Sequence, residues 1–196
     1  MSFFDNTKTV GWVMFIIGIL SLVSALVQIA NGATHDGDFV DKIGYVIAGI
    51  GALIGAFLLF KFGNGVRIGA TSSKLKIVAG FVKVVGAMSV VAGIFGIVGG
   101  IVIFSSNWSV LTGGVISLIL GAIVLFFGGK IDDGKNTAFD KILWIVLVVI
   151  FALLMISSLL SIGGGALGII TAVCEFIMYL FILVFMFDKE VKDAML

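Results

Sequence analysis

Four side chains in the apolar parts of the sequence have the chemistry to handle a proton or an ion. Glu175 is the one acidic residue in the run "GIITAVCEFIMYLFILVFMF". Thr171 and Tyr179 stand four residues to either side of it, so on a helix a hydroxyl, a carboxyl and a phenol share one face. Lys83 lies inside another apolar run. A charge at the centre of a bilayer costs about 2.5–3.5 kcal/mol, so both charges are expected to face protein or a wet cavity.

Several interpretations of this intramembrane polar cluster fit the sequence. Lys83 can extend its ammonium to the membrane interface, and Glu175 can be protonated and hydrogen-bond to a neighbouring helix. The two can instead form a structural ion pair with Tyr179 between them. In a last interpretation, Glu175, Tyr179 and Lys83 carry a proton or an ion across the membrane.

The elements that must position these side chains are membrane helices. The chain has 196 residues, of which 61% are hydrophobic and 12% charged, and its mean hydropathy is +1.30. Soluble domains carry about 25% charged residues. Six apolar runs each approach the ~20 residues that cross a bilayer core. They predict an all-α integral membrane protein, a single domain over 1–196, with the first run a retained helix rather than a cleaved signal peptide. The runs are 10–30, 43–60, 77–104, 111–128, 142–160 and 166–187.

Loop charge predicts the orientation of these helices. Ten of the twelve Lys and Arg residues lie in the N-terminal segment, the second and fourth loops, and the C-terminal tail. Lys42 is the one basic residue in the loops on the other side, and Lys83 is within a helix. The positive-inside rule therefore predicts that both termini lie in the cytoplasm. We expect a multi-pass protein of the inner or plasma membrane.

The chain reads as three copies of one helical hairpin, at roughly 1–65, 66–133 and 134–196. Odd-numbered helices begin after a lysine, and even-numbered helices end before one. All copies enter from the same side, so we expect a pseudo-three-fold arrangement about the membrane normal. Measured from these lysines, the counterparts of the two buried charges are isoleucines: Ile17 and Ile150 for Lys83, and Ile47 and Ile116 for Glu175.

The triplicated hairpin resembles the HdeD-like acid-resistance membrane proteins. The resemblance covers the whole chain and rests on the length, the tiny outer loops and glycine-rich helices such as "GWVMFIIGIL" and "GGVISLILGAIVLFFGG". It implies a small inner-membrane protein linked to acid stress, without known catalytic residues.

Glycines predict where the helices approach each other. Membrane helices associate by close backbone contact, which small residues permit. Two pairs have GxxxG spacing, and the third hairpin lacks such glycines and has bulky residues on all sides, which fits either lipid or another subunit. The glycines expected to pack are Gly51, Gly55, Gly86, Gly93, Gly96, Gly100 and Gly121.

The remaining residues offer little to an enzyme. The sequence shows no catalytic triad and no phosphate-binding loop, so we expect a non-enzymatic protein without a cofactor. Asp36, Asp38 and Asp41 beside His35 form an acidic loop without the other ligands of a calcium site, so no metal is expected, although His35 could sense external acid. The single Cys174 excludes a disulfide framework, and a net charge of +1 argues against nucleic acid as a partner.

Three functions fit these features. The first is a structural or stress-associated membrane protein that acts through self-association, as a homo-oligomer, or through partners in the lipid bilayer. The second is an accessory subunit of a larger membrane complex, which docks through the third hairpin. The third is a small proton or ion transporter that uses Glu175, Tyr179 and Lys83, although its unbroken helices are unlike those of most transporters.

The predicted orientation can be tested by cysteine labelling of intact cells. A membrane-impermeant thiol reagent should label Asp38→Cys and leave Asp5→Cys and Lys192→Cys unlabelled, because the positive-inside rule places both termini in the cytoplasm. Labelling of either terminus from outside would overturn the topology.

Overall fold

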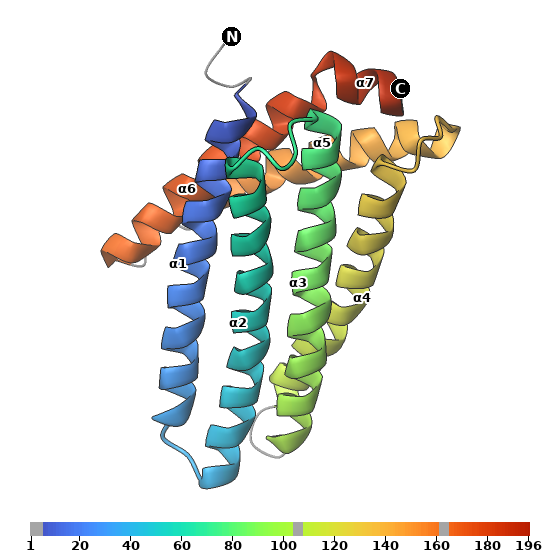
Figure 1. Cartoon of the computed structure of the whole chain (residues 1–196). Coiled ribbons are helices and arrows are strands. Elements are labelled where there is room, and N and C mark those ends of the chain that lie inside the picture. The colour runs from blue at the N-terminus through green and yellow to red at the C-terminus, as the bar shows by residue number, and fades with distance from the viewer. Residues whose placement is uncertain (1–5, 104–107, 161–164) are drawn as a thin grey trace. The chain divides into compact units, whose positions relative to one another are not determined.

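Within the described residues, 6–103, 108–160 and 165–196, every regular element of the computed structural model is a helix (Figure 1). Six of the seven helices are long and apolar enough to cross a membrane. The structure therefore confirms an all-helical fold with six long apolar helices. The helices are α1 (Thr7–Ala33), α2 (Phe39–Arg67), α3 (Lys74–Val102), α4 (Trp108–Ile131), α5 (Ala138–Leu160), α6 (Gly165–Met186) and α7 (Lys189–Met195).

The helices extend beyond the apolar runs that predict them. The run at 43–60 lies within the 29 residues of α2, and the C-terminal tail after Phe187 forms the short helix α7. Hydropathy marks only the apolar part of a helix. The helix itself extends into polar residues, up to the end where its last backbone groups have no partner within the helix. At about 1.5 Å per residue, α2 is roughly 44 Å long, which exceeds the ~30 Å of a hydrocarbon core.

Polar side chains set the first turn of five helices. Asn6 accepts from the N–H groups of Lys8 and Thr9 at 3.0 and 3.4 Å. At the start of α5, Asp140 Oδ2 accepts from both the N–H and the hydroxyl of Thr137 at 2.7 Å, which is the carboxylate half of a capping box. The other caps are Asp38 for α2, Ser73 for α3 and Asp188 for α7. These short polar residues accept hydrogen bonds from N–H groups that have no partner inside the helix.

Glycine ends α2. Gly69 adopts φ +81°, a left-handed conformation that is strained for other residues. Its N–H donates to the carbonyl of Val66 at 3.0 Å, and the next N–H, of Ala70, donates to Gly65 at 2.9 Å. The helix therefore closes on itself before the connection to α3.

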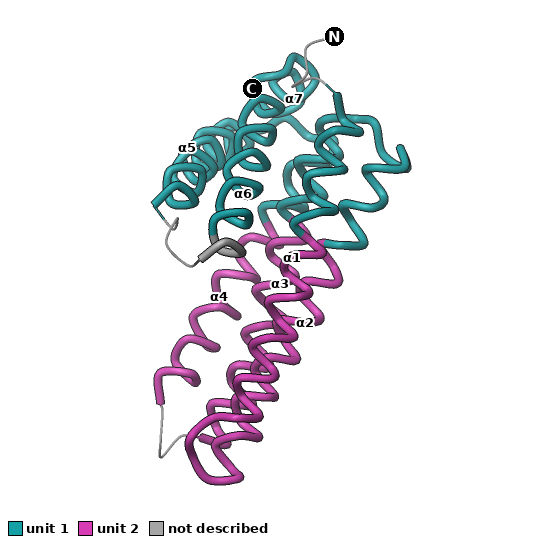
Figure 2. The backbone as a smooth tube through the Cα atoms, turned by 90° about the vertical axis from the view of Figure 1, so that its left-hand side faces the viewer, with its two compact units in different colours: residues 1–17, 60–82, 127–196 teal, residues 18–59, 83–126 magenta. Residues whose placement is uncertain are grey.

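The chain divides into two compact units, which Figure 2 shows in different colours. Unit 1 contains residues 1–17, 60–82 and 127–196, and unit 2 contains residues 18–59 and 83–126. The hairpin of α1 and α2 and the hairpin of α3 and α4 each contribute segments to both units, whereas α5, α6 and α7 belong wholly to unit 1. The three-fold repeat of the hairpin stays a prediction.

In unit 2, α3 and α4 approach each other through glycines on both helices. A Cβ atom added to Gly93 would lie 2.5 Å from the backbone nitrogen of Leu118, and one added to Gly121 would lie 2.6 Å from that of Val90. Such distances leave no room for a side chain. The face of α4 that meets α3 repeats every three or four residues: Leu111, Gly114, Leu118, Gly121 and Leu125.

Close contact at glycine also joins α2 to α3 in unit 2. Between α2 and α3, a Cβ on Gly51 would lie 2.5 Å from the Cβ of Phe95. Gly44 and Gly99 also face each other, since a Cβ on Gly99 would lie 2.4 Å from the carbonyl oxygen of Gly44. Gly55 is less crowded, with its nearest neighbour atom, in Met88, at 3.4 Å. The remaining glycines singled out in the sequence meet α4: Gly86 meets Leu125, Gly96 meets Gly114, and Gly100 meets Leu111.

Unit 1 combines close backbone contact with aromatic packing. A Cβ on Gly11 would lie 2.2 Å from the backbone nitrogen of Arg67, so α1 and α2 touch here. The Arg67 guanidinium carbon lies 4.4 Å from the ring centroids of both Trp12 and Phe15, a cation–π arrangement. The Nη2–H of Arg67 also donates to Asn64 Oδ1 at 2.6 Å. These contacts hold the polar end of α2 as a helix.

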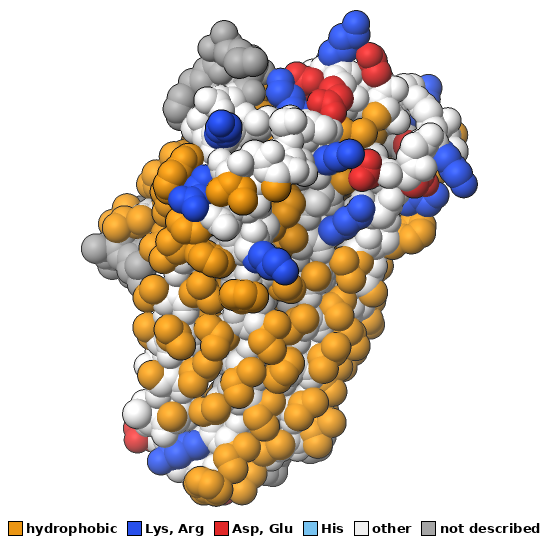
Figure 3. All heavy atoms as spheres, in the orientation of Figure 1, with side chains coloured by type: hydrophobic (Ala, Val, Ile, Leu, Met, Phe, Trp, Pro, Cys, Tyr) orange, Lys and Arg blue, Asp and Glu red, His pale blue; other side chains and the backbone are white. Residues whose placement is uncertain are grey.

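Hydrophobic side chains cover the helices on the face shown in Figure 3, and charged side chains gather around α7 and the connections of unit 1. Exposed residues with large apolar side chains occur on all six long helices. A surface this apolar suits a hydrocarbon environment rather than water.

Two glycines of α4 provide a matched test of the α3–α4 contact. Gly121→Ala should destabilise the protein by about 1–3 kcal/mol, because the new methyl group would meet the backbone of α3. Gly113, with nothing within 4 Å of an added Cβ, is the control. Gly113→Ala should be neutral or stabilising by up to about 1 kcal/mol through helix propensity. Thermal unfolding in a mild detergent measures both, and equal effects of the two changes would refute the close approach.

Candidate functional site

Thr171, Glu175 and Tyr179 lie on one face of α6, an unbroken helix from Gly165 to Met186. All three side chains are half-buried. The sequence spacing thus leads to a helical stripe of a hydroxyl, a carboxyl and a phenol. Such a stripe can exchange hydrogen bonds along a helix or with a neighbouring helix.

Tyr179 packs against the beginning of α3 within unit 1. Its ring centroid lies 6.4 Å from that of Phe81, in an edge-on arrangement, and Phe81 lies 6.1 Å from Phe151 of α5. Phe81 is 1% exposed. Aromatic pairs at these distances and angles stabilise each other beyond the burial of their surface, so this cluster fixes the position of the tyrosine.

Lys83 is half-buried and follows Phe81 by two residues on α3. Residues two apart on a helix do not share a face, so Lys83 projects from a different side of α3 than the ring that meets Tyr179. Lys83 also belongs to unit 2, whereas Glu175 belongs to unit 1. An ion pair between Lys83 and Glu175 stays a prediction.

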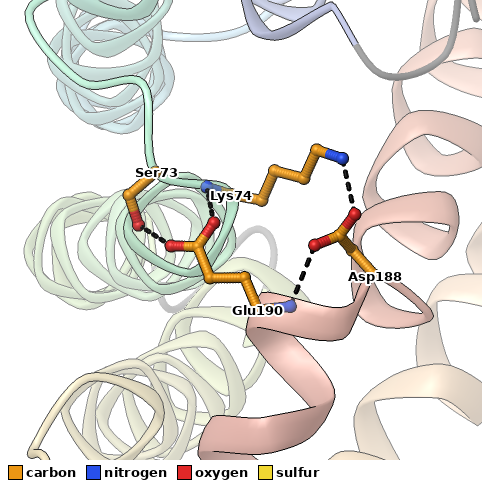
Figure 4. A network of polar contacts seen from close by, with 4 residues as sticks. All are labelled: Ser73, Lys74, Asp188 and Glu190. Atoms are coloured by element: carbon orange, nitrogen blue, oxygen red, sulfur yellow. Dashed lines mark hydrogen bonds and ion pairs between the residues drawn. The ribbon is translucent and has the colours of Figure 1, made fainter. Parts of the chain in front are cut away.

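A second polar group holds the C-terminal helix to the start of α3; we name it the C-terminal anchor, and Figure 4 shows its residues Ser73, Lys74, Asp188 and Glu190. The hydroxyl of Ser73 donates to Glu190 Oε1. The backbone N–H of Lys74 donates to Glu190 Oε2 at 3.1 Å. The Lys74 ammonium lies 2.5 Å from Asp188 Oδ2. Two carboxylates from α7 and its cap therefore accept hydrogen bonds from the first turn of α3.

The anchor is supported by packing from α5. Trp144 Nε1–H donates to the carbonyl of Met186 at 2.8 Å, and its ring meets that of Phe187 edge-on at 5.2 Å. Val191 and Met195 of α7 are buried. A seven-residue helix is too short to be stable alone, so these contacts keep α7 folded.

A third feature is a groove of about 300 Å³ between α1 and α2 in unit 2, which we name the α1–α2 groove. His35, considered above as an acid sensor, stands there beside Tyr45, with ring centroids 4.5 Å apart. The remaining lining residues are Gln28, Asn31, Gly32, Ala48 and Gly49.

Charge pairs also order the connection between α4 and α5. The Lys130 ammonium lies 2.8 Å from Asp133 Oδ2, and the N–H of Lys135 donates to the same carboxylate at 3.0 Å. These donors lower the pKa of Asp133. A lowered carboxyl pKa stabilises the folded connection above the unfolded pKa, and that contribution is lost as the pH falls through the folded pKa.

Sequence reasoning missed the anchor and the groove. An aspartate followed by an acidic and then an apolar residue is typical of a helix start. Asp188, Glu190 and Val191 have this order and could have indicated α7. Gln28 and Asn31 are three residues apart, which places them on one side of α1. His35 follows two residues after the helix ends at Ala33. The partners of the anchor lie more than a hundred residues away, and no local pattern indicates them. The groove is completed by Tyr45, Ala48 and Gly49 of the neighbouring helix α2. Among the residues that the structure describes, no group of three metal-ligating side chains comes together.

Comparisons with protein-family models, with curated proteins and with solved structures found no match. The function of this chain must therefore be argued from its own residues.

The C-terminal anchor can be tested with two changes in the same helix. Glu190→Ala removes the acceptor of two hydrogen bonds from α3, and Asp193→Ala removes the same charge from an exposed position. The first change should speed amide hydrogen exchange of α7 about fivefold, which corresponds to a loss of about 1 kcal/mol. The second should leave it unchanged. Equal exchange in the two variants, measured by mass spectrometry, would show that the anchor does not hold α7.

Proposed function

We propose that the chain is a non-enzymatic multi-pass membrane protein that acts by self-association, with its termini in the cytoplasm. The six long apolar helices support membrane insertion. The loop charge supports the orientation. Self-association rests on the surface of α4.

The low burial of α4 carries the proposal. Only 11% of its most apolar 18-residue stretch is buried within the chain, against 33% for α1, α2 and α6. Gly114 and Gly121 face α3, as described above. Bulky side chains on the other side of α4 face away from α3, with Ile116, Ile119 and Leu120 each more than half exposed.

A second copy of the chain fits this face. Lipid tails are as apolar as leucine, so helices in a bilayer associate by van der Waals packing rather than by expulsion of water. The exposed face of α4 presents branched aliphatic side chains that can interlock with the same face of another copy about a two-fold axis. A symmetric contact brings each residue near its own counterpart, and this face between residues 115 and 126 carries no charge that would repel itself.

The other functions remain proposals with narrower support. A link to acid stress rests on the resemblance to HdeD-like proteins. A role as an accessory subunit rests on the exposed apolar side chains of α5, such as Ile142, Leu153 and Leu160. Proton or ion transport rests on the stripe of Thr171, Glu175 and Tyr179 on α6.

Disulfide cross-linking in membranes tests the proposed contact. In a Cys174→Ser background, Ile119→Cys should form a cross-linked dimer under mild oxidation, because the two-fold contact brings the two positions together. Val23→Cys on α1 is the matched control, since Val23 is 43% exposed and Ile119 is 55% exposed. The control should stay monomeric.

The mass of the protein in mild detergent completes this test. We expect a dimer or a larger homo-oligomer. A monomer that also fails to cross-link at position 119 would contradict self-association. A complex with a different protein would favour the accessory subunit instead.

A further inference from the structure

The α1–α2 groove combines a floor of small residues with polar walls. Gly32, Ala48 and Gly49 form part of its lining, and the amides of Gln28 and Asn31 stand beside them. Its volume of about 300 Å³ is at the lower end of the range for small-molecule sites, roughly 300–1,000 Å³. The groove is large enough for a headgroup-sized molecule and too small for a helix.

The approach of the two helices fixes the floor. A Cβ atom on Gly49 would lie 2.7 Å from Ile29 Cγ1, and one on Gly32 would lie 3.0 Å from the Cβ of Tyr45. The helices therefore touch at these glycines. The longer side chains of Gln28, Asn31 and Tyr45 surround this contact, and the groove lies between them.

The walls select a neutral ligand with several hydroxyl groups. Each of the two amides offers hydrogen-bond donors and an acceptor. The neutral imidazole of His35 and the phenol of Tyr45 can each donate one hydrogen bond and accept another. Among the residues that the structure describes, no Lys, Arg, Asp or Glu lines the groove, so a phosphate would find no permanent cation and an ammonium no carboxylate. The ring pair of His35 and Tyr45 adds an apolar wall on which the flat face of a sugar can lie.

The depth of the groove matches the headgroup region of a bilayer. Asn31 is 21 residues beyond Val10, where the first apolar run begins, which is about 32 Å at 1.5 Å per residue. A hydrocarbon core is ~30 Å thick, with polar headgroups beyond it. In the proposed orientation the groove lies at the outer surface, and its amides remain exposed to that layer.

We propose that the α1–α2 groove binds a neutral, hydroxyl-rich group, such as the sugar of a glycolipid headgroup or a free sugar of the same chemistry. The amides of Gln28 and Asn31 hydrogen-bond to its hydroxyls, and the His35–Tyr45 pair packs against its ring. This site is separate from the face of α4 proposed for self-association, so either proposal can fail alone.

Native mass spectrometry of the protein with added lipids tests the site. The probes are monoglucosyl diacylglycerol and phosphatidylcholine with the same acyl chains, and the detergent is a polyoxyethylene ether without sugar. The wild-type protein should retain the glucolipid about tenfold more than phosphatidylcholine. Equal retention of the two lipids would overturn the proposal, and this comparison needs no variant.

Two variants locate the binding. Asn31→Leu should reduce retention of the glucolipid about tenfold, because it removes hydrogen-bonding groups from the groove. Asn136→Leu makes the same change at an exposed position of the connection before α5 and should have no effect. An unchanged Asn31→Leu variant, or an equal loss in both variants, would show that the groove is not the site.

Free methyl glucoside separates the two sources of the ligand. Displacement of the glucolipid by the free sugar would show that the headgroup alone is recognised and that a soluble sugar can bind. Retention of the glucolipid against millimolar free sugar would assign the site to a lipid. Both results support a hydroxyl-rich ligand, whereas binding of neither probe would refute it.

Discussion

Close contact between helix backbones at glycine is the interaction on which the structure of unit 2 depends. Gly93 and Gly121 bring α3 and α4 to distances at which any side chain would collide with the neighbouring backbone. In a hydrocarbon environment there is no hydrophobic force between helices, so this contact must supply the attraction. The helices themselves satisfy their own backbone hydrogen bonds, as lipid requires.

The same contact decides which side chains remain outside. Because Gly114 and Gly121 of α4 face α3, large residues of this helix such as Ile119 and Leu120 are exposed. Between α1 and α2 the contact at Gly32 and Gly49 leaves room for polar side chains to surround a groove. Both surfaces proposed for binding thus follow from where small residues lie. Unit 1 combines the same kind of backbone contact, at Gly11, with aromatic rings and with charges at its polar end.

The sequence predicts the apolar helices well because length and composition are local properties. Their polar ends are less predictable: α2 continues to Arg67, which lies over the rings of Trp12 and Phe15 far away in the chain. The C-terminal anchor joins residues more than a hundred positions apart, so the local sequence offers no sign of it. The stripe around Glu175 follows from helical spacing alone, but spacing does not identify its partner on another helix.

The central claim is that α4 lies in lipid with its glycine face against α3 and its bulky face outward. A scan of nitroxide labels along residues 111–125, with oxygen and a nickel chelate as relaxation agents, tests it most directly. The account predicts oxygen accessibility that oscillates with a period of 3.6 residues. It should be low at Leu118, which meets Gly93, and high at Ile119 and Ile116, with the nickel chelate excluded throughout. Uniform accessibility to oxygen, or nickel contact near the middle of the helix, would contradict it.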